Sequence, residues 1–186
     1  TLKGAFDKIN DGTHKGSILI EISASTNEGA TPATLLSGDA DPTNYSDILI
    51  MPTADAVSVS GNPASGFGVV QLNGADNVTI MGDNLNTAGT NKDLSIVNTA
   101  AAATGYTSCL RVATLAGNSA SADNIFILNC NFVGNVTAGN ASGITATTSS
   151  SNTSFGLYFG GKGSATTTLG AITSETADAA LSGTTM

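Results

Sequence analysis

Three aspartates stand directly before runs with the composition of β-strands, and carboxylates in such a series could do chemistry. They are Asp76, Asp93 and Asp123. A polysaccharide hydrolase needs two or three carboxylates that converge on one bond, and stacked strands could align these three in a row. An aspartate before a strand also makes local hydrogen bonds to backbone N–H groups. We favour the second interpretation and predict turn chemistry at all three positions.

A polysaccharide lyase would need a basic residue to abstract a proton, beside acidic residues that hold calcium. Arg111 is the only arginine of the chain and stands between Leu110 and Val112. Because side chains alternate along a strand, Arg111 is expected to point opposite to these two residues, outward from the core. Acidic residues on the same kind of face are scattered singly, so the sequence predicts no lyase site around Arg111.

A calcium site is conceivable in one acidic loop. Asp39, Asp41 and Asp47 cluster there with Asn44, and oxygen atoms are the ligands that calcium takes in proteins. The spacing matches no standard calcium loop, and the terminal bidentate glutamate of such loops is missing. We therefore predict a solvated acidic loop.

The remaining candidates for metal, nucleophile or phosphate chemistry are isolated from one another. His14 is the only histidine and belongs to the turn at residues 11–16, which predicts a surface role. Cys130 follows a strand-like run, which favours a small buried thiol; a Cys109–Cys130 disulfide and a reactive thiol stay open as alternatives. The glycine-rich segment 160–164 lacks the spacing and the following helix of a phosphate-binding loop. No catalytic, cofactor or metal site is predicted.

One aromatic cluster could contact a ligand. It consists of Phe155, Tyr158 and Phe159. Alternating spacing assigns Phe159 to the core together with Leu157, whereas Tyr158 faces solvent. Packing within the strand is the favoured role, and stacking of Tyr158 on a sugar ring is the alternative.

Composition limits the function classes. The chain has 186 residues, a formal net charge of −8, 11% charged residues and 40% hydrophobic residues. The apolar content predicts a folded chain, since disorder usually combines high charge with few apolar residues. A nucleic-acid-binding protein needs a basic face, and an acidic chain is also repelled by anionic membranes and polysaccharides. Few lysines, many Thr, Ser and Asn residues and an acidic balance are typical of an extracellular surface protein.

Short apolar bursts recur along the chain and indicate the elements that must position these residues. Five bursts share an apolar-x-apolar pattern and are followed by turn-forming residues. They are 48–50, 78–80, 94–96, 125–127 and 157–159, with Ser17–Ile22 as an upstream member. The steps between the first residues of the five bursts are 30, 16, 31 and 32 residues. A repeat near 30 residues fits one coil of a solenoid; for the 16-residue step, either two bursts lie on different faces of one coil or one coil is tight.

A second register supports the repeat. Val70-Gln71-Leu72 and Leu110-Arg111-Val112 each precede an Ala-Asp-Asn triplet, and each triplet opens a burst of the main series. The chain is thus predicted to be one domain, residues 1–186, with a cap helix at 1–11, coils at 17–162 and a weakly patterned tail at 163–186. Thr1 is the expected helix N-cap, and the apolar residues 2, 5, 6 and 9 share one face. Residues 38–44 and 134–154 are expected loops, and 174–183 is a candidate short helix.

Two segments carry a family resemblance. Residues 1–22, TLKGAFDKINDGTHKGSILIEI, and residues 72–80, LNGADNVTI, resemble the opening of large secreted bacterial surface proteins with right-handed parallel β-helix repeats, many of them exported by the type IX route. The resemblance covers about residues 1–130. It implies a right-handed parallel β-helix whose first coil is capped by a helix, and it implies no reaction. The sorting domain of that family is not visible, which suggests a fragment or a processed form.

Together these observations predict an all-β, right-handed parallel β-helix with a short N-terminal cap helix. The expected function is that of an extracellular structural or adhesive surface protein, with a self-assembling filament or coat subunit as one form. Its partners would be other copies of the chain, other surface proteins or glycans. The alternatives are a polysaccharide-binding module and, less favoured, a polysaccharide lyase or hydrolase.

Overall fold

The protein is built mainly of parallel β-strands. The computed structural model describes residues 1–101, 107–114, 120–134, 154–162 and 181–182. These residues form one helix, α1 (Leu2–Asn10), and fourteen strands. Twelve of the strands belong to three four-stranded parallel sheets, and the other two form a short parallel pair. The predicted all-β class is thus confirmed at the level of three parallel sheets.

We name the four-stranded sheets A, B and C. Sheet A contains β1 (Gly16–Ile22), β4 (Tyr45–Pro52), β7 (Val78–Met81) and β11 (Ile125–Leu128). Sheet B contains β2 (Thr26–Asn27), β5 (Val57–Gly61), β8 (Leu94–Asn98) and β12 (Asn131–Val133). Sheet C contains β3 (Ala33–Leu36), β6 (Gly68–Asn73), β9 (Thr107–Thr114) and β13 (Ser154–Lys162). The two-stranded pair is β10 (Ala122–Asp123) with β14 (Leu181–Ser182).

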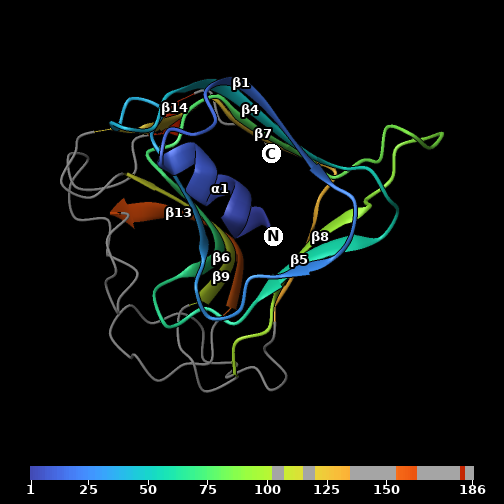
Figure 1. The fold of residues 1–186 in the computed structure, drawn as a ribbon. Coiled ribbons are helices and arrows are strands. Elements are labelled where there is room, and N and C mark those ends of the chain that lie inside the picture. Colours follow the sequence, from blue (N-terminus) through green and yellow to red (C-terminus); the bar gives the residue numbers. More distant parts are fainter. Residues whose placement is uncertain (102–106, 115–119, 135–153, 163–180, 183–186) are drawn as a thin grey trace.

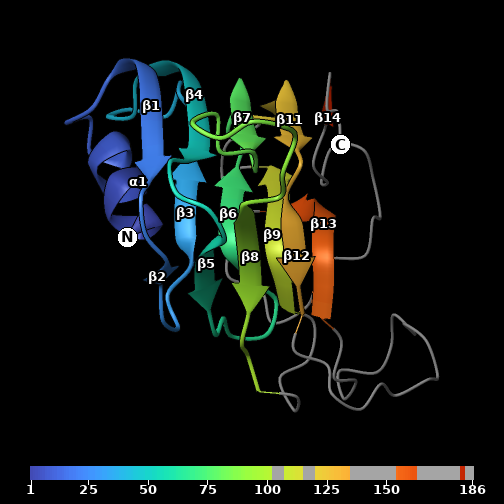
Figure 2. The same cartoon turned by 90° about the vertical axis from the view of Figure 1, so that its right-hand side faces the viewer.

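The chain passes through sheets A, B and C in turn, and we call each such passage a circuit. Every circuit adds one strand to each sheet, so that strand order within a sheet follows sequence order. Figure 1 shows the three sheets around α1 as seen along the stack, and Figure 2 shows α1 at the end of the stack that holds β1 and β3. The N-terminal helix therefore lies over the first circuit.

The core is made of side chains that repeat from one circuit to the next. Alternate residues of each strand point inward, and the strand register places apolar side chains beside apolar side chains of the neighbouring strand. In sheet A, Ile48, Val78 and Ile125 are direct neighbours, and each is at most 1% exposed. Leu72 and Val112 pair in sheet C and are completely buried. Each circuit thus buries its apolar face against the circuits on both sides.

The structure corrects the predicted series of bursts. The 16-residue step runs from Val78 in sheet A to Leu94 in sheet B, so these two bursts lie in two sheets of one circuit. This is the first of the two alternatives given above for that step. The step from Leu94 to Ile125 joins sheet B to sheet A, and the step from Ile125 to Leu157 joins sheet A to sheet C, where Leu157 pairs with Leu110, so both predicted steps are wrong as repeats. The second register, in contrast, is confirmed, because Val70 pairs with Leu110. Strands of all three sheets carry the same apolar-x-apolar pattern, and the pattern alone does not say which sheet a strand joins.

Circuit length varies. Ser17 and Asp47 occupy neighbouring positions in sheet A and are 30 residues apart. The equivalent corner positions Asn77 and Asn124 are 47 residues apart. Residues 82–93, which separate β7 from β8, supply part of the extra length of the third circuit, and the longer passage from β9 to β11 supplies more of it.

Helix α1 forms where the sequence predicts a cap. The Thr1 side chain accepts a hydrogen bond from the Gly4 N–H at 3.1 Å, and Leu2, Phe6 and Ile9 are buried. At the far end, the Asn10 side chain donates to the Thr34 carbonyl and accepts from the Leu36 N–H. These are backbone groups that a further strand of sheet C would use, so the helix closes the edge of β3.

A buried glutamate holds the other end of α1. The Glu28 carboxylate accepts hydrogen bonds from the Leu2 N–H at 3.1 Å and the Lys3 N–H at 2.9 Å. The first N–H groups of a helix have no partner within the helix and carry its positive dipole end, so a carboxylate is well suited to them. Thr26 donates to the same carboxylate. The first circuit and α1 are thus joined at both ends of the helix.

The predicted loops and tail lie largely outside the described residues. This holds for 135–153 and for 163–180. Within the candidate helix at 174–183, Leu181 and Ser182 form strand β14 beside β10, so the prediction is wrong at these two positions.

Candidate functional site

The predicted row of three aspartates is in fact two corners. Asp76 and Asp123 lie at equivalent positions of consecutive circuits, and the Asp123 N–H donates to Asp76 Oδ1 at 2.8 Å. Asp93 lies at the start of sheet B strand β8, where its carboxylate accepts from the Asn84 N–H at 3.1 Å. The three carboxylates do not converge on one point. Each accepts a hydrogen bond, but these are not the local bonds from backbone N–H groups that were predicted: the N–H donors to Asp76 and Asp93 are 47 and 9 residues away, and Ser121 donates a hydroxyl to Asp123.

Asparagines beside these aspartates form a ladder that sequence reasoning missed. Asn77 and Asn124 adopt left-handed backbone conformations, with φ of 54° and 55°, which asparagine tolerates better than most residues. The Asn124 side-chain amide donates to Asn77 Oδ1 at 3.0 Å, and that of Asn77 donates to the Ser46 carbonyl. The repeated Ala-Asp-Asn triplet was the available signal. Its role is to turn the chain into sheet A and to tie consecutive circuits together.

Burial dominates the electrostatics of this corner. It raises the pKa of Asp76, and the nearby carboxylates of Asp123 and Asp39 act in the same direction, against the hydrogen bond from the Asp123 N–H. Tyr45 lies beside it and donates to the Leu36 carbonyl at 2.8 Å. Burial raises the pKa of this phenol too. The corner thus places the half-buried Asp76 and Asp123 beside the buried Tyr45 and uses them for hydrogen bonding between circuits.

We expect Asp76→Asn to stabilise the fold at neutral pH. A raised pKa means that the folded state binds a proton more tightly than the unfolded state, so this group's stabilisation is complete below the unfolded pKa, near 3.8, and is lost as the pH rises through the folded pKa. Asparagine keeps the acceptor oxygen without the charge. The gain should therefore shrink as urea unfolding is measured from about pH 7 down to about pH 3.

Asp47 supplies the matched control with the opposite sign. Hydrogen bonds from Ser17 and Ser46 lower its pKa, so its stabilisation is present above the unfolded pKa and is lost as the pH falls. Asp47→Asn should then cost stability at neutral pH and not at low pH. Equal destabilisation by Asp76→Asn at both ends of the pH range would contradict the account of this corner.

Of the four candidate calcium ligands in the acidic loop, Asp39, Asp41 and Asn44 line one pocket, and Asp47 does not. Asp39 and Asp41 border an open pocket of about 310 Å³, and Lys15 lines it too. Asp47 lies in β4, where the Ser17 and Ser46 hydroxyls donate to it at 2.7 and 2.8 Å. Over the described ranges, no group of three or more His, Cys, Asp and Glu side chains is arranged to hold a metal ion.

Arg111 alternates with the core residues Leu110 and Val112, as predicted, but its side chain is covered and does not lie on an open surface. Its side chain is 1% exposed, and Nη1 donates to the Gly66 carbonyl at 2.8 Å. In sheet C it lies in a cross-strand row between Gln71 and Tyr158. Burial lowers its pKa, while Tyr158 acts in the opposite direction. The hydrogen bond to the Gly66 carbonyl thus holds the Arg111 guanidinium group against sheet C.

Both cysteines are free thiols, which excludes the disulfide alternative. Cys109 is completely buried and Cys130 is half-buried. Their Sγ atoms lie 3.3 Å from the carbonyls of Val133 and Leu128, respectively. Burial raises the pKa of each thiol to about 11.

These two thiols should be unreactive in the folded protein. The thiolate is the reactive species, and at about pH 8 a thiol with a pKa of about 11 is almost wholly protonated. A thiol-reactive dye should label neither residue in native buffer and both in urea, as read by mass spectrometry. Labelling of Cys130 in native buffer at the rate seen in urea would contradict the half-buried position of this thiol.

The aromatic cluster follows the predicted alternation at Leu157 and Phe159, whereas Phe155, at the same spacing as these two, contacts Tyr158. Leu157 and Phe159 pack against the core. Phe155 and Tyr158 are half-buried, and their ring centroids lie 5.6 Å apart in a tilted arrangement. Of the glycine-rich segment 160–164, residues 160–162 end strand β13, and 163–164 lie outside the described residues.

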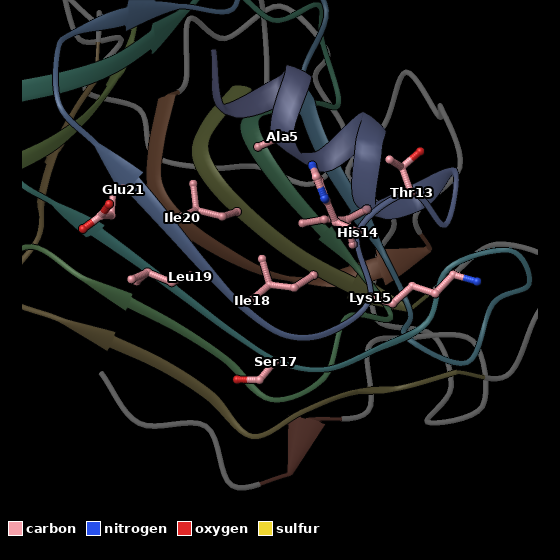
Figure 3. A pocket seen from close by; sticks show the side chains of 10 residues that line it. Ala5, Thr13, His14, Lys15, Ser17, Ile18, Leu19, Ile20 and Glu21 are labelled. Atoms are coloured by element: carbon pink, nitrogen blue, oxygen red, sulfur yellow. The ribbon is translucent and has the colours of Figure 1, made fainter.

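His14 lies at the surface, as predicted, and borders a groove that the sequence did not reveal. The groove has a volume of about 510 Å³ and runs between α1 and β1 (Figure 3). Ten residues line it: Ala5, Ile9, Thr13, His14, Lys15, Ser17, Ile18, Leu19, Ile20 and Glu21. Finding it required knowing that α1 packs over sheet C, which leaves the inner side of β1 partly open.

Within the described ranges, no helix combines the length and the apolar character needed to cross a bilayer. No protein-family model matches the chain, and no curated protein or solved structure matches it. A function therefore has to follow from the fold and from the geometry of these residues.

Proposed function

We propose that this chain is a right-handed parallel β-helix that serves outside the cell as a structural or adhesive surface module. The three-sheet circuits support the β-helix, since each circuit stacks one strand on each sheet. The right-handed sense of the β-helix is inferred from the family resemblance of residues 1–22 and 72–80. The extracellular location comes from that resemblance and from the acidic composition, poor in lysine.

The observation that carries the structural role is the repetition of the same interactions along the stack. Core columns such as Ile50, Ile80 and Ile127 run through consecutive circuits in register. The Asn77–Asn124 ladder repeats the same corner outside the core. An architecture of this kind makes a rod whose side faces are the working surface.

Lateral contact is the mode of assembly that we propose. The outer side of α1 carries the exposed ion pairs Lys3–Asp7 and Lys8–Asp11, and such a charged, solvated surface disfavours stacking of another rod on this end. Sheet A instead presents apolar side chains outward: Leu19 and Phe126 lie in one cross-strand column and are 55% and 38% exposed.

Electron microscopy of the purified chain at micromolar concentration tests this role. We expect ordered side-by-side arrays, more abundant at high salt because salt screens the repulsion between acidic rods. Phe126→Ser should reduce the arrays, and Leu85→Ser, which removes an exposed apolar residue elsewhere, should not. Isolated particles under all conditions would contradict assembly, and release of sugars from a panel of polysaccharides would contradict a non-enzymatic role.

Polysaccharide binding is the second candidate, and one observation favours it. The half-buried rings of Phe155 and Tyr158 lie together on β13, and partly exposed aromatic rings can stack on sugars. Binding on a glycan array that is lost in Tyr158→Ala and kept in Phe126→Ser would support this candidate. An array without any hit would argue against it.

A further inference from the structure

The first strand of sheet A has an open edge. Sheet A begins with β1, and no strand in the described part of the chain pairs with the edge of β1 that faces away from β4. Gly16 donates its N–H to Asn44, and Ile22 accepts from Thr53, so these even-numbered positions face β4. Backbone groups alternate in direction along a strand, which leaves those of residues 17, 19 and 21 directed at the open edge.

This edge differs from those of the other two sheets. Asn10 occupies backbone groups of β3, and Glu28, next to β2, is occupied by the first turn of α1. The edge of β1 instead borders the groove between α1 and β1. A second hollow of about 230 Å³ continues it past the end of β1, and the two share Ala5, Ile20 and Glu21. The helix is thus tied to β3 and to the residue after β2, whereas the edge of β1 borders the groove.

The groove has an apolar floor. Ile18 and Ile20 point from β1 toward the helix, and Ala5 faces them from α1 (Figure 3). Both isoleucines are only half-buried, whereas Ile48 and Ile50, their neighbours on β4, are 1% exposed. One more strand beside β1 would cover the isoleucines as β1 covers β4. An occupant with alternating apolar side chains fits this floor.

Opposite charges mark the two ends of the groove. Lys15 precedes β1 and Glu21 lies near its end, and both side chains are exposed. Within the described residues, neither charge takes part in a salt bridge or a side-chain hydrogen bond. Because every strand pairing of this fold is parallel, an added strand that starts with a carboxylate and ends with a cation would match both charges.

The helix limits the occupant to a single segment. A complete further circuit would need the edge of β3 and the end of the core, and α1 covers both. We propose that the groove between α1 and β1 binds one extended peptide segment of a partner protein, which adds to sheet A parallel to β1. Its alternate apolar side chains face Ile18 and Ile20, its acidic first residue lies near Lys15, and its basic last residue lies near Glu21.

Two synthetic heptapeptides test this site. The probe is acetyl-Asp-Ile-Thr-Ile-Thr-Ile-Lys-amide, whose seven residues are matched to residues 15–21, so that isoleucines fall beside Ile18 and Ile20. The control exchanges the terminal Asp and Lys. We expect the probe to bind about tenfold more tightly than the control in fluorescence anisotropy, since two surface charge pairs are reversed. The double variant Lys15→Glu, Glu21→Lys should invert this preference, and Lys92→Glu, an exposed charge change outside the groove, should leave it unchanged.

Three results would overturn the proposal. They are failure of both peptides to bind, equal binding of the two peptides, and a preference that the double variant does not change. Sedimentation of the chain alone distinguishes a second copy as the occupant, because a dimer that the double variant abolishes would assign the groove to self-association. Loss of the lateral arrays in Phe126→Ser with peptide binding intact would separate this site from the proposed assembly surface.

Discussion

Gly82→Ala is expected to lose about 3 kcal/mol or more of the free energy of unfolding, since overpacking against fixed backbone has no cheap relief. A Cβ atom at Gly82 would lie 2.6 Å from the Asn129 carbonyl carbon and 2.9 Å from the Cys130 Cα, and both are backbone atoms of the next circuit. Gly82 also donates its N–H to Leu128 at 2.7 Å and accepts from the N–H groups of Asp93 and Leu94. The substitution would therefore separate the third and fourth circuits.

Urea unfolding followed by circular dichroism measures this effect. Gly4→Ala is the matched control, because a Cβ there meets only the Thr1 hydroxyl, at 3.3 Å. Gly4 is the third residue of α1, in its first turn, and alanine is favoured over glycine in a helix by up to about 1 kcal/mol, so the control should be neutral or stabilising. Equal stability of Gly82→Ala and the parent protein would show that the third and fourth circuits do not approach as closely as the structure has them.

Glu28→Ala is expected to cost about 2 kcal/mol and to loosen α1. It removes the acceptor for two N–H groups of the helix and for the Thr26 hydroxyl, and hydrogen bonds to a charged group are worth more than neutral ones. Glu21→Ala is the control: Glu21 is exposed, and its loss should change stability by less than about 0.5 kcal/mol. Hydrogen exchange at Leu2 and Lys3 should accelerate in Glu28→Ala alone; unchanged exchange there would contradict the capping role.

Local patterns predicted individual elements well. The apolar residues at helical spacing and the Thr1 cap predicted α1, and short apolar bursts predicted strands of all three sheets. The assignment of the bursts to one series was the part that failed, at Leu94 and at Leu157, which belong to sheets B and C. Each burst carries the same alternation, so only the length of the connections separates the sheets, and that length varies between circuits.

Contacts between distant residues explain what the sequence did not reveal about the candidate sites. Glu28 is 26 residues from Leu2, and nothing in its neighbourhood marks it as a helix cap. Arg111 stands in an alternating strand that predicts exposure, but the Gly66 carbonyl, 45 residues away, accepts its hydrogen bond. The Ala-Asp-Asn triplet was recognisable as a turn, whereas its ladder needed the register of successive circuits.

The register of β5 against β8 tests the stacked circuits most directly. Ser58 and Ser95 are Cα partners on neighbouring strands of sheet B, and both are partly exposed. Neighbouring strands lie about 4.8 Å apart, within the Cα separation that a disulfide spans. The pair Ser58→Cys, Ser95→Cys should therefore form a disulfide rapidly under mild oxidation, while Ser58→Cys, Val97→Cys, displaced by two residues along the same face, should form one slowly. Equal rates for the two pairs, or no bond in the first, would contradict the three-sheet stack.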